Sequence, residues 1–158
     1  MEKTDELFMK EALAEAEKAA RLGEVPVGAV AVADGRIVAR AGNRRESGRM
    51  ATAHAEMLCL EECCRTLGRW RLEDVTLYVT LEPCPMCAGA VFNARVGRVV
   101  YGAKDPSMGA CGSVLDLRAY PLHTNTQFTG GVCARESGEL LRDFFARRRL
   151  EKEKQCPD

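Results

Sequence analysis

Apolar residues recur along this chain with two different periods, one helical and one extended. Residues 5–22 carry an apolar stripe at helical spacing that is rich in alanine. Residues 27–33 are short, apolar and rich in valine, and Asp34-Gly35 is a strong hairpin signal. We therefore expect an N-terminal helix that packs closely on a sheet, followed by a strand, a tight turn and a returning strand over 36–40.

The same patterns extend through the rest of the chain. They predict helices over 53–67, 83–95 and 136–149, and strands over 75–80, 98–101 and 127–129. Thr52 is the expected N-cap of the second helix, Gly68 its stop, and Pro83 is expected in the first turn of the third. Strands that alternate with helices predict an α/β layered domain with some parallel pairing.

Composition limits the class of protein further. The chain has 158 residues, of which 46% are hydrophobic and 29% charged, which predicts one domain over 1–158 with its core at about 5–150 and a polar tail at 151–158. No apolar run approaches the ~18 residues of a membrane span, and the N-terminus is acidic, so we expect a cytoplasmic protein. The net charge of zero gives no global sign of nucleic-acid binding. Basic residues nevertheless cluster in two places, at Arg44, Arg45 and Arg49 and at Arg142, Arg147, Arg148 and Arg149.

Two short motifs carry the chemistry. His54-Ala55-Glu56 and Pro83-Cys84-Pro85-Met86-Cys87 together offer three zinc ligands, His54, Cys84 and Cys87, and one spare carboxylate. A hydrolytic zinc site needs three protein ligands, an open fourth position for water and a proton carrier. Because Glu56 lies roughly 200° around a helix from His54, both can reach a metal only beyond the end of the helix.

The eight cysteines leave alternatives open. A structural zinc site would need a fourth ligand, from Cys59, Cys63, Cys64, Cys111 or Cys133, and a redox Cys-x-x-Cys pair would not explain His54 or Glu56. The preferred interpretation makes Cys59 and Cys63 small core residues, Cys64 partly exposed, Cys156 a free thiol in the tail and His123 a loop residue.

These residues suit one kind of reaction. Zinc lowers the pKa of a bound water towards ~7, which provides a nucleophile at neutral pH. Glu56 would carry the water proton to a ring nitrogen and later to a leaving amine, which is general acid–base work typically worth ~10²–10⁴-fold. The pattern therefore predicts replacement of an exocyclic amino group by a carbonyl on a heteroaromatic ring.

The motifs also resemble a known family. Glu24-Val25-Pro26-Val27-Gly28-Ala29, Thr52-Ala53-His54-Ala55-Glu56, the segment 76–84 and Gly109-Ala110-Cys111-Gly112-Ser113 are similar to zinc-dependent nucleobase deaminases of the cytidine/deoxycytidylate deaminase superfamily, and within it to the branch that acts on tRNA. The resemblance implies a three-layer α/β/α fold around a five-stranded mixed sheet, one Zn²⁺ per chain and a homodimer. It also implies hydrolytic conversion of adenosine to inosine at the wobble position of a tRNA anticodon.

Further roles are implied by the same resemblance. Asn43 would hydrogen-bond the flipped base, the Ala55 backbone would face the base edge, Val27 would wall the pocket and Asp105 would lie in a loop against the RNA. On the residues alone, the preferred interpretation of Asn43 is a loop-capping asparagine. Expected RNA contacts are Arg44 and, on the terminal helix, Arg147 and Arg148. Two positions depart from the family: Ser107 stands where relatives often carry lysine, and Gly42 where some carry tryptophan.

Two rival functions share the zinc motif. One is deamination of a free base or nucleoside of the guanine or cytosine type, against which the arginine-rich helix and the glycine-rich segment 102–113 argue. The other is a non-catalytic zinc-stabilised subunit of a heterodimeric editing enzyme, which would be expected to lack the acid–base residue that Glu56 provides.

Overall fold

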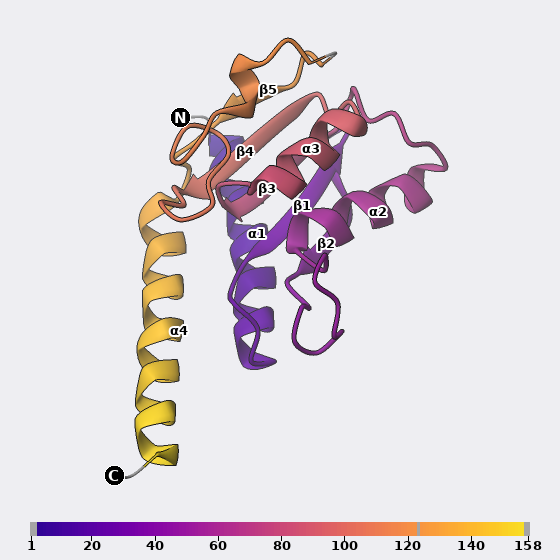
Figure 1. Ribbon diagram of the computed structural model, residues 1–158. Coiled ribbons are helices and arrows are strands. Elements are labelled where there is room, and N and C mark those ends of the chain that lie inside the picture. Colours follow the sequence, from indigo (N-terminus) through magenta and orange to yellow (C-terminus); the bar gives the residue numbers. More distant parts are fainter. Residues whose placement is uncertain (1–2, 123, 157–158) are drawn as a thin grey trace.

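A mixed five-stranded sheet forms the centre of the protein (Figure 1). The computed structural model describes residues 3–122 and 124–156. β1 pairs antiparallel with both β2 and β3, whereas β3, β4 and β5 run parallel, in the order β2-β1-β3-β4-β5. The strands are β1 (Gly28–Ala33), β2 (Arg36–Gly42), β3 (Thr76–Leu81), β4 (Arg98–Ala103) and β5 (Gln127–Thr129).

Helices cover both faces of this sheet. The helices are α1 (Lys3–Arg21), α2 (Ala55–Leu67), α3 (Pro85–Asn93) and α4 (Ala134–Gln155), with a 3₁₀ turn at Leu117–Ala119. One apolar cluster joins α2 and α3 to the face that carries Ala31, Leu77 and Val99. A second cluster joins Met9 and Ala12 of α1 to the opposite face. The three-layer α/β/α architecture with a five-stranded mixed sheet, expected from the sequence, is confirmed.

Local sequence accounts for the β1–β2 hairpin and for the packing of α1. Asp34 and Gly35 both have positive φ, 49° and 71°, as a two-residue type I′ turn requires. A Cβ on Gly28 would lie 2.1 Å from the carbonyl oxygen of Ala12, so β1 passes α1 at a distance that only small residues allow. The close packing of α1 on β1 therefore requires the small side chains of the alanine-rich stripe.

Two helices begin later than the sequence predicts. α3 starts at Pro85 and not at Pro83, because the residue before a proline avoids the helical conformation, and Cys84 is extended at φ −74°, ψ 172°. α2 starts at Ala55 with His54 as its N-cap, and not after Thr52. Here the first helical N–H donates to the side chain of Asn43 at 2.8 Å, so a distant asparagine provides the cap.

α4 is longer than predicted. It extends from Ala134 to Gln155, and Figure 1 shows it running beside α1 and continuing past the end of that helix. Residues 151–155, expected as a polar tail, are helical because Glu, Lys and Gln are good helix formers. Within the described residues, no helix combines the length and apolarity needed to cross a bilayer.

Candidate metal centre and active site

The ends of two helices bring the zinc-motif residues together. His54 is the N-cap of α2 and Cys84 is the N-cap of α3, both with extended backbone angles. β3 leads directly into the turn that carries Cys84, and Cys87 follows in the first turn of α3. The centre therefore lies beyond two helix N-termini, as the angular separation of His54 and Glu56 predicts.

The three side chains form a compact donor set. His54 Nδ1 lies 3.6 Å from Cys84 Sγ and 3.4 Å from Cys87 Sγ, and the three ligand atoms lie within 4.8 Å of one another. One imidazole nitrogen and two sulfurs suit Zn²⁺. Over residues 3–122 and 124–156 no fourth cysteine, histidine or carboxylate joins the group, so the donor set is that of a catalytic zinc site and not of a closed structural one.

Among these three side chains, electrostatics favour the ligating form of Cys84. A hydrogen bond from the Cys87 thiol, with a further contribution from His54, lowers the pKa of Cys84 to about 4. The same interaction raises the pKa of Cys87, and the hydrogen bond to Cys84 raises the pKa of His54. Free N–H groups at the start of α3 add to the stabilisation of a thiolate. The lowered pKa favours the thiolate at Cys84, whereas Cys87 must lose its proton when it binds the metal.

Glu56 sits beside the donor set without belonging to it. The residue is only 4% exposed, and burial raises the pKa of its carboxyl above the ordinary value. A carboxyl that keeps its proton more readily than usual is suited to passing that proton between a water molecule and a substrate.

A pocket of about 550 Å³ opens onto these residues. It contains His54, Cys84 and Glu56 together with three residues implied by the resemblance, Val27, Asn43 and Asp105. The volume is in the range of small-molecule sites and is large enough for one nucleobase. The remaining lining residues come from loops, the end of β3 and the start of α3: Glu24, Val25, Arg45, Glu46, Ala51, Leu81, Glu82, Pro85, Met86 and Met108.

The contacts of Asn43 and Asp105 define what each can still do. Asn43 Oδ1 accepts the N–H of Ala55 at 2.8 Å, so the amide orientation is fixed and its Nδ2 group is left to donate into the pocket. Ala55 itself is fully buried and its N–H is used in this bond. Asp105 Oδ1 accepts from Ser107 and Met108, which shapes the loop at the pocket wall.

The predicted RNA contacts do not lie in this pocket. Arg44 lines a separate hollow beside β2 and α2, and Arg147 and Arg148 line a groove between α1 and α4. Arg45, and not Arg44, faces the catalytic pocket. The sequence analysis also did not assign Glu24 to the pocket that it lines. The indication in the sequence was a carboxylate that stands shortly before an apolar strand.

The remaining cysteines have ordinary structural environments. Cys59 and Cys63 are fully buried in the core, and burial raises the pKa of Cys63 to about 11. Cys64 is half-buried and Cys156 exposed. His123 lies outside the described residues.

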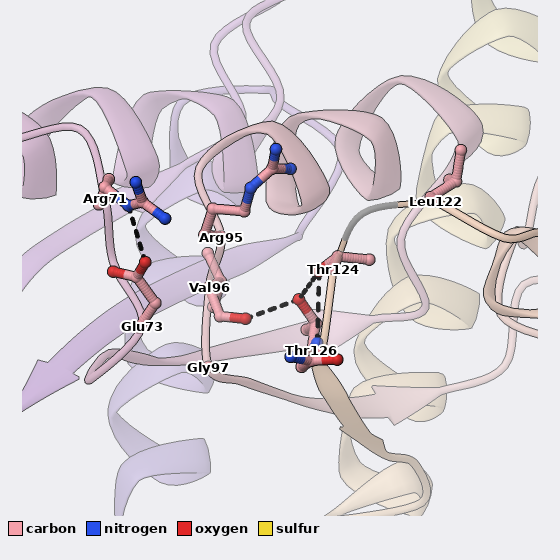
Figure 2. Close-up of a pocket in the computed structure, with 9 residues that line it drawn as sticks. Arg71, Glu73, Arg95, Val96, Gly97, Leu122, Thr124 and Thr126 are labelled. Atoms are coloured by element: carbon pink, nitrogen blue, oxygen red, sulfur yellow. Dashed lines mark hydrogen bonds and ion pairs between the residues drawn. The ribbon is translucent and has the colours of Figure 1, made fainter.

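A second hollow, of about 740 Å³, lies at the opposite end of the parallel strands (Figure 2). Its polar groups already have partners: Arg71 pairs with Glu73 at 2.8 Å, and Thr126 donates to the carbonyl of Val96 at 2.6 Å. Among the residues that the structure describes, its lining includes no histidine or cysteine. The chemistry is therefore assigned to the pocket above the helix ends.

Comparison with known proteins agrees with this geometry. A sequence model of the cytidine and deoxycytidylate deaminase zinc-binding region matches residues 2–103, and the chain therefore belongs to this family of zinc-dependent deaminases. Zinc is accordingly its cofactor, with the His54, Cys84 and Cys87 group as the donor set that the structure offers.

Individual relatives are more specific. The chain is 52% identical over 153 residues to the tRNA-specific adenosine deaminase of Bacillus subtilis, which covers 96% of this chain and 94% of that protein. A solved structure from a study of A-to-I editing by tRNA:A34 deaminases superimposes with a TM-score of 0.83 at 46% identity, covering 85% of this chain and 99% of that one. A guanine deaminase from Nitrosomonas europaea gives 0.76 at 26% identity, covering 89% and 84%.

Proposed function

We propose that the protein is a tRNA adenosine deaminase that converts the wobble adenosine of an anticodon to inosine by hydrolysis of the amidine C–N bond. The observation that carries the chemistry is an open His–Cys–Cys donor set with the buried Glu56 at its side, in a pocket sized for one base. The similarity over nearly the whole chain to a tRNA-specific adenosine deaminase supports the choice of substrate.

The residues divide the reaction between them. His54, Cys84 and Cys87 would hold zinc, which supplies Lewis-acid activation of a water molecule. Glu56 takes a proton from that water and delivers it to N1 of the adenine ring, which makes C6 electrophilic. The water oxygen bonds to C6, and Glu56 takes the second water proton from the new C6 hydroxyl and passes it to the amine. The C6–N6 bond then breaks as the C6 carbonyl forms, so that ammonia leaves and inosine, protonated at N1, remains.

Base recognition falls to the pocket walls. Asn43 donates from Nδ2 to a ring acceptor, because its Oδ1 is already held by the N–H of Ala55. Val27 gives an apolar wall, and the loop that begins at Asp105 closes the opposite side. A base must leave its stack to enter such a pocket.

The wider partners follow from the same proposal. Arg44 and the α4 residues Arg147 and Arg148 contact the tRNA backbone, and no ion pair or hydrogen bond within the described residues engages their guanidinium groups. Exposed apolar side chains at Met108, Val114 and Leu115 support a homodimer, which sedimentation would test. A tRNA substrate supports a cytoplasmic location for the enzyme.

Inosine analysis of tRNA tests the function directly. Total tRNA incubated with the purified, zinc-loaded protein is expected to gain inosine at position 34 of an adenosine-containing anticodon, with release of ammonia. Heat-treated protein is the control. Absence of inosine, with the zinc content at one per chain, would contradict the proposal.

A free-base deaminase is the second candidate, because a guanine deaminase shares the fold at a TM-score of 0.76. Guanine, cytosine and their nucleosides offered to the same preparation distinguish the two. Ammonia from free guanine without inosine in tRNA would favour this candidate.

A further inference from the structure

Arg45 is an arginine without a protein partner at the wall of the catalytic pocket. It is exposed and lines the pocket that contains His54 and Glu56. No hydrogen bond or ion pair joins its guanidinium to any described residue. By contrast, several arginines elsewhere on the surface each pair with a carboxylate, namely Arg40, Arg65, Arg69, Arg71, Arg118 and Arg135. Arg44, Arg147 and Arg148 likewise have no such bond, so Arg45 is distinguished by its position on the wall of the catalytic pocket.

The buried carboxylate of Glu24 holds the loop that presents Arg45. Glu24 is 1% exposed, and its two oxygens accept the backbone N–H groups of Glu46 at 3.2 Å and Ser47 at 2.6 Å. These amides are the two that follow Arg45 in the chain. Residues 44–50 are all exposed, so the loop has little packing of its own, and this clamp fixes the direction of the Arg45 backbone.

Arg45 places a positive charge on the wall of the pocket that also contains His54 and Cys84, so an anion that arrives with the substrate would be attracted to it. A zinc ion held by the donor set would repel this charge. Glu24, a buried acid of the same pocket, is occupied by backbone amides. Arg148 of α4 is also near enough to Glu24 to help lower the pKa of its carboxyl. A neutral base offers no anion to these groups, whereas a nucleotide within RNA carries a phosphate on each side of its sugar.

We propose that Arg45 binds a backbone phosphate next to the target nucleotide at the pocket mouth, and that Glu24 is the positioning residue that holds Arg45 there. The inference rests on the proposed RNA substrate and specifies how the pocket prefers a nucleotide in a chain over a free base. Arg45 touches a phosphate and not the reacting atoms, so it acts on binding.

The first experiment measures binding of an anticodon stem-loop with adenosine at the wobble position. Arg45→Ala in the zinc-loaded protein is expected to weaken binding about tenfold and to reduce the slope of log affinity against log salt by ~0.7–0.9. The turnover number at saturating RNA stays near that of the wild type. Arg65→Ala, which removes an exposed but carboxylate-paired arginine, is the matched control and changes neither quantity.

A neutral linkage identifies the phosphate. Stem-loops are prepared with a single methylphosphonate at each position flanking the adenosine. One of these stem-loops is expected to bind the wild type about tenfold more weakly than the unmodified stem-loop does. The same substitution should not weaken binding to Arg45→Ala any further, because both changes remove one and the same contact. The inference would be overturned if the affinity losses from the methylphosphonate and from Arg45→Ala were additive at every linkage. It would also be overturned if Arg45→Ala bound RNA with the affinity and the salt dependence of the wild type.

The second experiment tests Glu24 through the loop itself. In Glu24→Gln, one amide oxygen and one NH₂ group face two N–H donors, so the clamp weakens, and trypsin is expected to cut faster after Arg44, Arg45 and Arg49, with zinc still bound. RNA affinity falls towards that of Arg45→Ala. Glu82→Gln, which neutralises a buried carboxylate on the opposite wall, leaves cleavage at these sites unchanged. Glu24→Asp is the second variant if Glu24→Gln does not fold.

The outcomes separate the inference from the function. If the wild type forms no inosine in any stem-loop, the proposed function fails. If the wild type forms inosine, but Glu24→Gln and Glu24→Asp keep wild-type protection from trypsin, Glu24 does not position the loop. If Arg45→Ala retains full affinity in that active enzyme, the phosphate contact alone is refuted.

Discussion

The metal centre and the rim of its pocket are built from different kinds of structure. The donor set lies at two helix N-caps and one helical first turn, which the backbone of α2 and α3 places within 4.8 Å. The rim consists of exposed or glycine-rich loops that buried polar side chains hold from a distance. Glu24 binds the loop after β2, and Glu82 accepts a hydrogen bond from Ser113 at 2.7 Å.

This difference in structure separates the residues that carry out the reaction from the residues that select the substrate. We expect a change at a helix end to remove the reaction, because among the described residues only His54, Cys84 and Cys87 form such a donor set. A change at the rim leaves the centre assembled and alters which substrate reaches it. The predictions below test this separation, from its largest consequence to its smallest.

Loss of a zinc ligand is expected to have the largest effect. Cys87→Ala leaves only two donors, so zinc content should fall well below one per chain and inosine formation should become undetectable. Treatment of the wild type with a chelator should do the same, and added Zn²⁺ should restore activity only to the wild type. Metal analysis beside the tRNA assay checks this, and an active, zinc-free Cys87→Ala would contradict the role of the centre.

Glu56→Gln is expected to separate metal binding from catalysis. Glutamine has the shape of glutamate but cannot carry the proton, so zinc should remain at about one per chain while turnover falls by at least ~10²–10⁴-fold. RNA affinity should be close to that of the wild type, because Glu56 lies at the base of the pocket. Near-normal turnover would remove Glu56 from this role.

The metal centre was predictable from sequence because its residues are close together in two short motifs. The spacing in Cys84-Pro85-Met86-Cys87 specifies one helical turn, and Asp34-Gly35 specifies the hairpin without any tertiary information. The predicted starts of the helices were wrong where two local sequence preferences competed. Pro83 was expected in the first turn of α3, but Pro85 keeps Cys84 out of the helix, and the Cys84 sulfur lies 3.6 Å from His54 Nδ1.

The rim was not predictable because its interactions join residues far apart in the chain. Glu24 contacts amides 22 and 23 positions away, and Asn43 caps a helix 12 positions away. Neither the hydrophobic periodicity nor the spacing of motifs in the sequence indicates such contacts. Adjacent residues also diverge: Arg44 and Arg45 look equivalent in sequence, yet they line different hollows.

A buried carboxylate far from the pocket should affect stability without affecting either region. Asp5 is 3% exposed and accepts two hydrogen bonds from Arg98 at 2.8 Å and one from Tyr78 at 2.9 Å. Asp5→Asn should lower the free energy of unfolding by roughly 2–4 kcal/mol at pH 7, because it leaves Arg98 without its carboxylate. Zinc content and turnover at 25 °C should be unchanged.

Acid should reproduce part of this effect. Arg98 holds the pKa of Asp5 below its ordinary value of 3.8, so the stabilisation is complete above about pH 4 and is lost as pH falls through the lower folded-state pKa. Urea unfolding at pH 7 and pH 3 should show a smaller pH dependence in Asp5→Asn than in the wild type. Equal dependence in both proteins would mean that Asp5 is not the titrating group.

The smallest effect is expected at the rim, on the loop that Glu82 holds. Ser113→Ala removes the hydrogen bond to Glu82 Oε1, which is worth about 1 kcal/mol, so the loop carrying Asp105 and Met108 becomes less ordered. KM for the stem-loop should rise by about threefold to fivefold, while kcat and zinc content stay at wild-type values. Gly109→Ala should raise KM further, because its Cβ would lie 1.6 Å from Glu82 Oε2 and must displace the loop. A fall in kcat with unchanged KM in either variant would show that the rim contributes to the chemical step, and the separation between centre and rim would then be wrong.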